Sequence, residues 1–298
     1  PMENIAINEI KQISLKEKAS AYFELTKPRI AFMLVLTAAA GFYLGLKGNF
    51  EIVPFINSMI GITLLAFGVS TLNQYIERQT DLLMERTATR PLPTSKVSPT
   101  EALVFGILLC LVAEIYLAVL VNPLTAALGL IVIVGYVFLY TPLKTRTSAS
   151  TAIGAIPGAM PPLMGWTSAA NEVSLPALIL FAMLFLWQFP HFLAIAWLYR
   201  EQYKKAGILM LPVVEPEGKM TARQIVIFAI MLLPISLAPF FVAMAGWIYL
   251  VGASVLGIWF LVESINTARE KSNKSAKRLL LVSVIYLPLI YGLMVVNH

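Results

Sequence analysis

The chain alternates between long apolar runs and shorter segments that carry nearly all of its charged residues. Several apolar runs reach the length of about 20 residues that a helix needs to cross a hydrocarbon layer of about 30 Å. The pattern therefore predicts an all-α fold, a polytopic membrane protein of about nine transmembrane helices. The predicted spans are residues 30–46, 54–72, 101–121, 123–141, 148–166, 174–198, 222–245, 247–265 and 277–296.

Lysine and arginine are distributed unevenly among the connections between these spans. All but one of the 22 basic residues lie in the N-terminal segment or in every second loop, and the exception is Lys47. Cytoplasmic loops hold the excess of basic residues in membrane proteins. The distribution predicts a cytoplasmic N-terminus, an external C-terminus and an odd number of spans. It also explains the net charge of +6 without a nucleic-acid partner.

Local signals divide the chain into an N-terminal cytoplasmic or interfacial segment, residues 1–28, and a transmembrane domain, residues 29–298. Ser14 and Glu17 have the spacing of a capping box, which predicts a helix after Ser14. This helix either lies at the membrane interface or is fully solvated. Thr221 has the same spacing to a glutamine, and Pro99 stands where a helix can begin.

Composition agrees with a membrane protein. The chain is 58% hydrophobic and 13% charged, whereas about a quarter of the residues in soluble domains are charged. Its single cysteine, Cys110, lies within an apolar run, which excludes an internal disulfide and argues against a thiolate metal site.

Polar residues concentrate after the second and sixth predicted spans. Asn73, Glu77 and Asp81 are spaced four residues apart, so on a helix they share one face. Such oxygen ligands suit Mg²⁺, which takes one or two carboxylates together with water and substrate phosphate oxygens. Arg86 and Arg90 follow, and guanidinium groups bind phosphate in a bidentate manner. Without the aligned acids, these arginines would be explained by the basic character of cytoplasmic loops alone.

The run from Asn73 to Asp81, followed by Arg86-Thr-x-x-Arg-Pro-Leu, resembles the first diphosphate motif of the UbiA-type intramembrane prenyltransferases. Within them, the protoheme IX farnesyltransferases (heme O synthases) are most similar. That narrower resemblance rests on residues 140–144 (YTPLK), 153–166 (IGAIPGAMPPLMGW), 185–194 (FLWQFPHFLA) and 203–214 (YKKAGILMLPVV).

The resemblance implies nine helices around a central cavity, in the inner (plasma) membrane with the active site facing the cytoplasm. It implies Mg²⁺ as cofactor, with farnesyl diphosphate and protoheme IX as substrates. Farnesyl is transferred to a vinyl group of the heme with addition of water, giving heme O and diphosphate. Assembly factors of a terminal oxidase are further expected partners.

The resemblance also implies roles for particular residues. Asn73, Glu77 and Asp81 become catalytic metal ligands, and Arg86, Arg90, Lys144 and Arg146 become diphosphate-binding residues. His191, Tyr199 and Tyr203 are expected to contact the heme acceptor. For His191, a structural role through a hydrogen bond to neighbouring backbone is an equal alternative.

The chain departs from the family pattern at two positions. Glu77 stands where the family usually has aspartate, which keeps the carboxylate and lengthens its reach. Gln202 stands where heme-type members usually have aspartate. Either Glu201 supplies the second carboxylate to the metal, or the site depends on Asn73, Glu77 and Asp81 alone.

Two other functions remain open at this point. A prenyltransferase acting on an aromatic or quinone precursor would share the first motif. A transporter would explain broken helices and polar residues in the membrane, although the acids cluster at one face rather than at the midplane.

Overall fold

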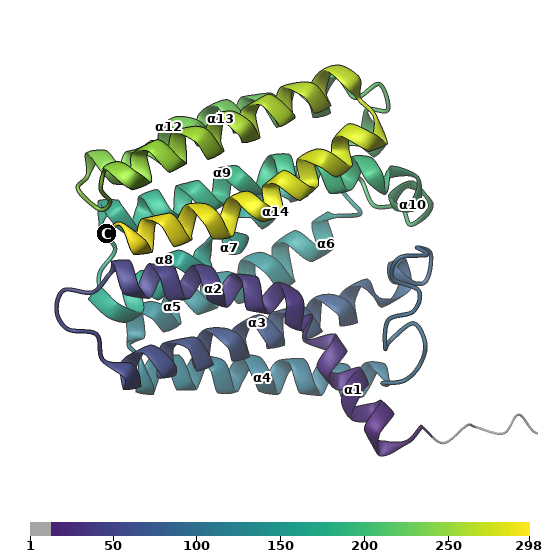
Figure 1. Cartoon of the computed structure of the whole chain (residues 1–298). Helices are drawn as coiled ribbons and strands as arrows, with labels where there is room; N and C mark the ends of the chain where they lie inside the picture. The colour runs from purple at the N-terminus through teal and green to yellow at the C-terminus, as the bar shows by residue number, and fades with distance from the viewer. Residues whose placement is uncertain (1–12) are drawn as a thin grey trace, which may run out of the picture.

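The computed structural model describes residues 13–298, and every regular element within them is a helix (Figure 1). The helices, including the π-helix η1, are α1 (Leu15–Leu25), α2 (Pro28–Leu44), α3 (Ile52–Asp81), α4 (Pro99–Leu120), α5 (Pro123–Ile133), η1 (Val134–Tyr140), α6 (Thr141–Leu143), α7 (Ser150–Gly158), α8 (Met160–Ala170), α9 (Leu175–Leu198), α10 (Arg200–Lys205), α11 (Leu211–Val214), α12 (Lys219–Phe241), α13 (Trp247–Glu270) and α14 (Asn273–Val296).

The predicted all-α polytopic fold is confirmed. Within residues 13–298, seven helices are long and apolar enough to cross a membrane, counting α5, η1 and α6 as one. The pair α1 and α2, bent by 45° where they meet, makes an eighth candidate. The first twelve residues of the predicted N-terminal segment lie outside the described residues.

The remaining predicted span, residues 148–166, is divided between α7 and α8, and each of these helices is too short to span a bilayer alone. The break falls at Ala159, between Pro157 inside α7 and Pro161 at the start of α8. Proline interrupts a helix because it lacks an N–H and crowds the preceding turn. The Gln188 amide of α9 donates to the carbonyl of Ala155 at 3.0 Å and joins α9 to the broken segment.

The exterior of the helical bundle is apolar, as expected for contact with lipid. Exposed large hydrophobic side chains include Ile115 and Val119 on α4, Phe138 on η1 and Val251 on α13. A soluble monomer rarely exposes apolar surface on this scale. The protein is a multi-pass membrane protein.

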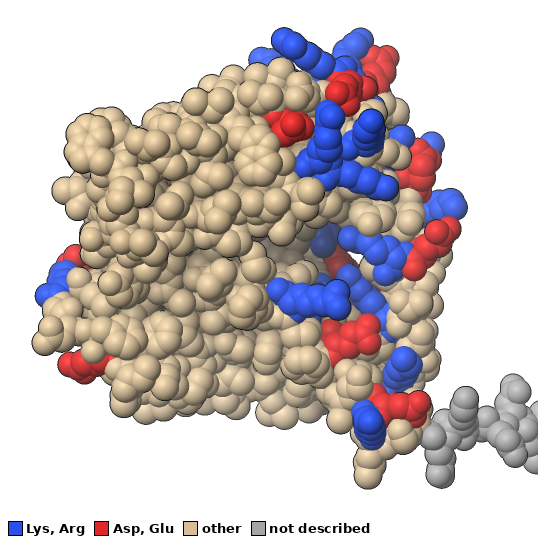
Figure 2. All heavy atoms as spheres, in the orientation of Figure 1, with Lys and Arg blue, Asp and Glu red and all other residues tan. Residues whose placement is uncertain are grey.

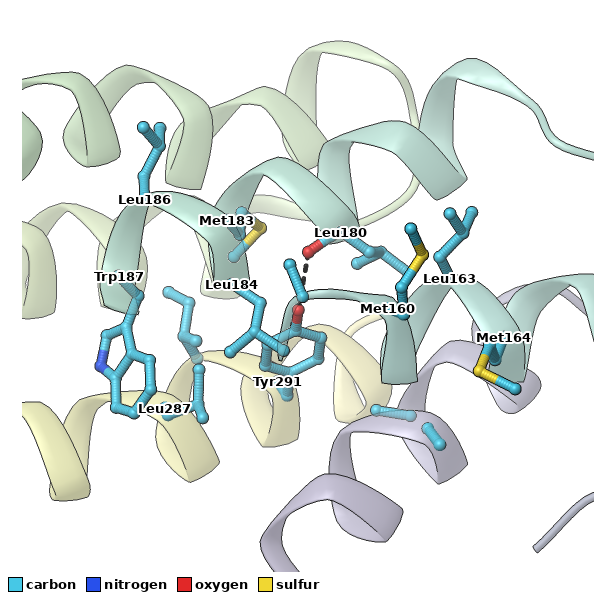
Figure 3. Close-up of a cluster of buried hydrophobic side chains, with 14 of the residues drawn as sticks. Met160, Leu163, Met164, Leu180, Met183, Leu184, Leu186, Trp187, Leu287 and Tyr291 are labelled. Atoms are coloured by element: carbon cyan, nitrogen blue, oxygen red, sulfur yellow. Dashed lines mark hydrogen bonds between the residues drawn. The ribbon is translucent and has the colours of Figure 1, made fainter. Parts of the chain in front are cut away.

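The hydrophobic core extends through the bundle, and one part of it lies where α8, α9 and α14 meet. Figure 3 shows methionine, leucine and aromatic side chains from these helices packed together, with the Tyr291 hydroxyl donating to the Leu180 carbonyl at 2.9 Å. Polar groups within a bilayer require internal partners of this kind.

Helices α2 and α8 pack with their backbones in close contact. A Cβ added at Gly165 would overlap the carbonyl of Ala38, and one added at Gly41 would overlap the carbonyl of Pro162. Small residues permit this approach in membrane bundles. The position of α2 is therefore fixed relative to α8.

Most of the helix-start signals are confirmed. Ser14 and Ser98 each form a complete capping box, and Pro99 occupies the first turn of α4. The expected start at Thr221 is wrong, because α12 already begins at Lys219. The Glu215 carboxylate accepts from the N–H of Lys219 at 2.8 Å and so caps this helix from the preceding turn.

Charged side chains gather at one end of the molecule (Figure 2). This end carries α1, α10 and the loop between α3 and α4, whereas the C-terminus lies at the opposite end (Figure 1). Lys47 pairs with Glu172 at 2.9 Å in the loops of that opposite end. The asymmetry expected from the sequence is thus present in the fold.

Candidate active site

The candidate site begins with α3, which is longer than the membrane requires. Its 30 residues correspond to about 45 Å at the usual rise, so its last turns extend to the charged end. Asn73 and Asp81 are buried there, and Glu77 lies between them with its side chain 12% exposed. The structure brings the three predicted residues together on one helix.

Each of the two carboxylates holds a cation from another part of the chain. Lys144 Nζ, directly after α6, donates to Glu77 Oε1 at 2.6 Å. Arg90 Nη1 donates to Asp81 Oδ2 at 2.7 Å. Burial disfavours the charged form of Lys144, but the Glu77 carboxylate together with Tyr140 and Tyr136 outweighs burial and raises the pKa of Lys144 well above its usual value. Two of the four predicted diphosphate-binding residues, Lys144 and Arg90, are therefore in contact with the predicted metal ligands.

A third cation, Lys27, completes this cluster. It lies at the bend between α1 and α2, and its Nζ donates to Asn73 Oδ1 at 2.6 Å. In the sequence, Lys27 is only one of several basic residues of the N-terminal segment, residues 1–28. A lysine directly before the proline that opens a span does not by itself indicate a binding site. The contact of Lys27 with Asn73 depends on the tertiary fold, which the local sequence does not show.

The π-helix η1 positions the other wall of the site. The Asn73 amide donates to Thr141 Oγ1 at 3.0 Å, and Thr141 in turn donates to the Tyr136 carbonyl at 2.7 Å. Lys144 lies 4.3 Å from the centre of the Tyr140 ring. A π-helix is rare and often marks a functional site, since it changes the direction of the side chains that follow. No pattern in the sequence indicates this π-helix.

Arg86 connects the loop after α3 to α10. Its Nη2 donates to the Tyr203 hydroxyl at 3.0 Å, and its guanidinium lies 4.7 Å from the centre of the Tyr199 ring. Gln202 Oε1 accepts from the Arg86 backbone N–H at 3.3 Å. Tyr203 and Met84 are both buried in a small apolar cluster under this contact. The two polar segments predicted to carry function therefore touch each other.

Glu201 and Arg146, predicted to hold the metal and the diphosphate, are not brought into the cluster. Glu201 is exposed, and its nearest cation is the adjacent Arg200 at 3.9 Å. Arg146 is exposed and takes part in none of the ion pairs found within residues 13–298. The arrangement favours the alternative in which Asn73, Glu77 and Asp81 serve without Glu201.

His191 lies on α9 and contacts α14. Its Nδ1 is 2.7 Å from Ser283 Oγ of α14, and its ring stacks on Trp187 with 4.6 Å between centres. Trp187 Nε1 donates to the Ser283 carbonyl at 2.9 Å. The partner of His191 is thus a serine side chain rather than the backbone considered from sequence.

The donor set fits a metal that is completed by its substrate. Among the described residues, no group of three or more His, Cys, Asp or Glu is arranged to hold a metal ion. Mg²⁺ needs no such group, because one or two carboxylates with water and phosphate oxygens satisfy it. Glu77, Asp81 and the Asn73 amide oxygen provide that partial set. The neighbouring cations provide partners for phosphate.

Comparison with known proteins gives matches over nearly the whole chain. The sequence profile of the UbiA prenyltransferase family matches residues 34–287. The protoheme IX farnesyltransferase of Solibacter usitatus is 47% identical over 286 residues, covering 93% of this chain and 98% of that protein. The protoheme IX farnesyltransferase of Koribacter versatilis is 45% identical over 287 residues, covering 93% of each chain. The resemblance found in the sequence is confirmed.

Solved structures show the same fold at low identity. A structure of digeranylgeranylglyceryl phosphate synthase has a TM-score of 0.80 at 17% identity and covers 94% of this chain and 98% of that chain. A UbiA homologue from Archaeoglobus fulgidus, bound to GPP and Mg²⁺, has a TM-score of 0.67 at 18% identity over 92% and 99% of the two chains. Fold and sequence agree, and this chain belongs to the UbiA prenyltransferase family.

Proposed function

We propose that this chain transfers the farnesyl group of farnesyl diphosphate to a vinyl group of protoheme IX, giving heme O and diphosphate. The observation that carries the proposal is the buried pair Glu77 and Asp81 with Lys144 and Arg90, in a chain 47% identical to a protoheme IX farnesyltransferase. Oxygen ligands and cations alternate in one small volume, as recognition of a metal-bound diphosphate requires.

Asn73, Glu77 and Asp81 would hold Mg²⁺ in this proposal. When bound, the metal neutralises charge that develops on the departing diphosphate. Arg90 and Lys144 exchange part of their contact with the carboxylates for the phosphate oxygens. Arg86, held by Tyr203, closes the same end of the site.

The remaining chemistry needs positioning rather than a strong base. The bond between the farnesyl C1 and the diphosphate oxygen breaks, and its electron pair leaves with the diphosphate. The vinyl π electrons form the new carbon–carbon bond, and the resulting cation is captured by water, which loses a proton. Correct placement of two bound reactants supplies much of such a rate enhancement.

The acceptor would contact the aromatic residues beyond the diphosphate. We assign this role to His191, Tyr199 and Tyr203, which lie on α9, at its end and on α10. Trp187 and Ser283 fix the ring plane of His191.

The site is assigned to the cytoplasmic face of the inner membrane. The cluster lies at the last turns of α3 and the loop that follows them, at the end of the molecule where charged side chains gather in Figure 2, and cytoplasmic loops hold the basic excess. An association with assembly factors of a terminal oxidase remains a prediction.

The test uses the purified full chain in detergent. It is incubated with protoheme IX, farnesyl diphosphate and Mg²⁺, and the heme fraction is analysed by mass spectrometry. A heme carrying one farnesyl group and one added water is the expected product. A farnesylated aromatic acid in a parallel incubation, with unchanged heme, would refute the assignment of the acceptor.

A further inference from the structure

The bend at Lys27 is an unusual piece of backbone. Lys27 has φ 52° and ψ 57°, the left-handed region that residues with a side chain rarely adopt. Such conformations persist where the surrounding structure enforces them, and they concentrate at functional sites. Pro28 follows directly and opens α2. The bend therefore places one particular side chain at one particular point.

Two neighbouring amides of α3 hold this bend. Gln74 Nε2 donates to the carbonyl of Leu25 at 2.9 Å, and it is buried. Asn73 Oδ1 accepts from Lys27 Nζ at 2.6 Å. Gln74 thus fixes the backbone and Asn73 the side chain, from the helix that carries the two carboxylates.

The charges of the cluster do not pair evenly. Lys144 and Arg90 each contact a carboxylate, whereas the hydrogen-bond partner of Lys27 is the neutral Asn73 amide. None of the ion pairs found within the described residues includes Lys27. A half-buried ammonium that no carboxylate contacts directly is costly, and a bound anion removes part of that cost.

We propose that Lys27 is a further diphosphate-binding residue, held at the bend between α1 and α2 so that its ammonium contacts the phosphate oxygens of the donor. The proposal rests on the proposed function for the identity of the ligand. In this proposal the bend and the amides of Asn73 and Gln74 act together. They hold the Lys27 ammonium beside the metal ligands without a carboxylate in contact with it.

The experiment measures two ligands separately on the purified full chain. Mn²⁺ alone is titrated first, as a probe for the carboxylates, and inorganic pyrophosphate is then titrated in saturating Mn²⁺. Lys27→Gln keeps a donor for Asn73 and removes only the charge. It should weaken pyrophosphate binding by about tenfold or more, the usual scale of one lost charge-assisted contact. Mn²⁺ binding should be unchanged or tighter, because a like charge has been removed.

Controls separate a binding role from a structural one. Lys27→Arg should restore pyrophosphate binding, and Lys27→Met should show at least the loss of the glutamine variant. Lys18→Gln is the matched control, since Lys18 lies on the neighbouring helix α1 and pairs with Glu101 outside the cluster. It should bind both ligands normally.

The proposal is overturned if Lys27→Gln binds pyrophosphate like the wild type. It is equally overturned if pyrophosphate and Mn²⁺ binding weaken together, since that outcome shows a disturbed fold. If the wild type itself binds no pyrophosphate with Mn²⁺, the diphosphate site of the proposed function fails as well. The wild-type titration thus distinguishes the two failures.

Discussion

The ion pair between Asp81 and Arg90 offers the sharpest test of the metal assignment. Asp81→Asn keeps the shape of the side chain and one acceptor oxygen for Arg90, but removes the negative charge. The Asp81 side chain is 2% exposed and that of Arg90 is 24% exposed, so the lost charge lies in a poorly hydrated place. We expect the variant to fold and to lose its affinity for metal.

The magnitudes follow from the contacts. Removing one partner of a buried ion pair costs about 3–5 kcal/mol, and we expect about 1–2 kcal/mol here because the amide still accepts from Arg90, which water reaches. A lost charge-assisted contact to the metal costs about 1.5–3 kcal/mol, which corresponds to a rise of about 10- to 100-fold in the Mg²⁺ concentration required. Donor binding without metal should not weaken, since the cluster becomes more positive.

The assay titrates Mg²⁺ against farnesyl diphosphate binding and records thermal unfolding in the same detergent. Glu101→Gln is the matched control, because Glu101 pairs with Lys18 at the same end of the molecule but outside the cluster. An unchanged Mg²⁺ requirement in Asp81→Asn would refute the assignment of Asp81. If the Mg²⁺ requirement rose equally in Asp81→Asn and Glu101→Gln, the effect would come from the general loss of negative charge at this end of the molecule.

Three further outcomes are expected. Tyr203→Phe removes the hydroxyl that accepts from Arg86 and should weaken donor binding by about fivefold, with little change in unfolding temperature, measured by the same titration. Glu201→Gln should change the Mg²⁺ requirement less than about threefold, because exposed charges contribute little, and a larger shift would return Glu201 to the metal site. Gly165→Val should destabilise the protein by more than about 3 kcal/mol, seen as loss of folded protein on detergent extraction, because its side chain would overlap the carbonyl of Ala38.

The sequence predicted the helices well because membrane spans follow from length and hydropathy alone. The predicted 174–198 and 277–296 coincide closely with α9 and α14. Helix starts were less certain, since Glu215 caps α12 from a turn that no local pattern indicates. The predicted span of residues 148–166 is divided between α7 and α8, and no pattern in the sequence indicated the π-helix η1.

The candidate site was predictable where its members share one helix. Asn73, Glu77 and Asp81 follow helical spacing, which the sequence displays directly. Lys27 was missed because only the bend between α1 and α2 brings it to Asn73. Glu201 was predicted as a possible metal ligand from its position in the sequence alone. Its side chain is exposed, because its orientation depends on the angle between α9 and α10.

The segregation of charge to one end of the bundle has a consequence for encounter rates. Both proposed substrates are amphiphiles, each with an anionic end and an apolar body. A bilayer already aligns such molecules, confines them to a layer and turns their charged ends toward the water. They then reach the protein by lateral diffusion, at the depth and in the orientation that the charged end of the bundle requires. The bilayer has thus already restricted the orientation of the substrates before they bind. Binding to the protein therefore costs less orientational entropy than it would from solution.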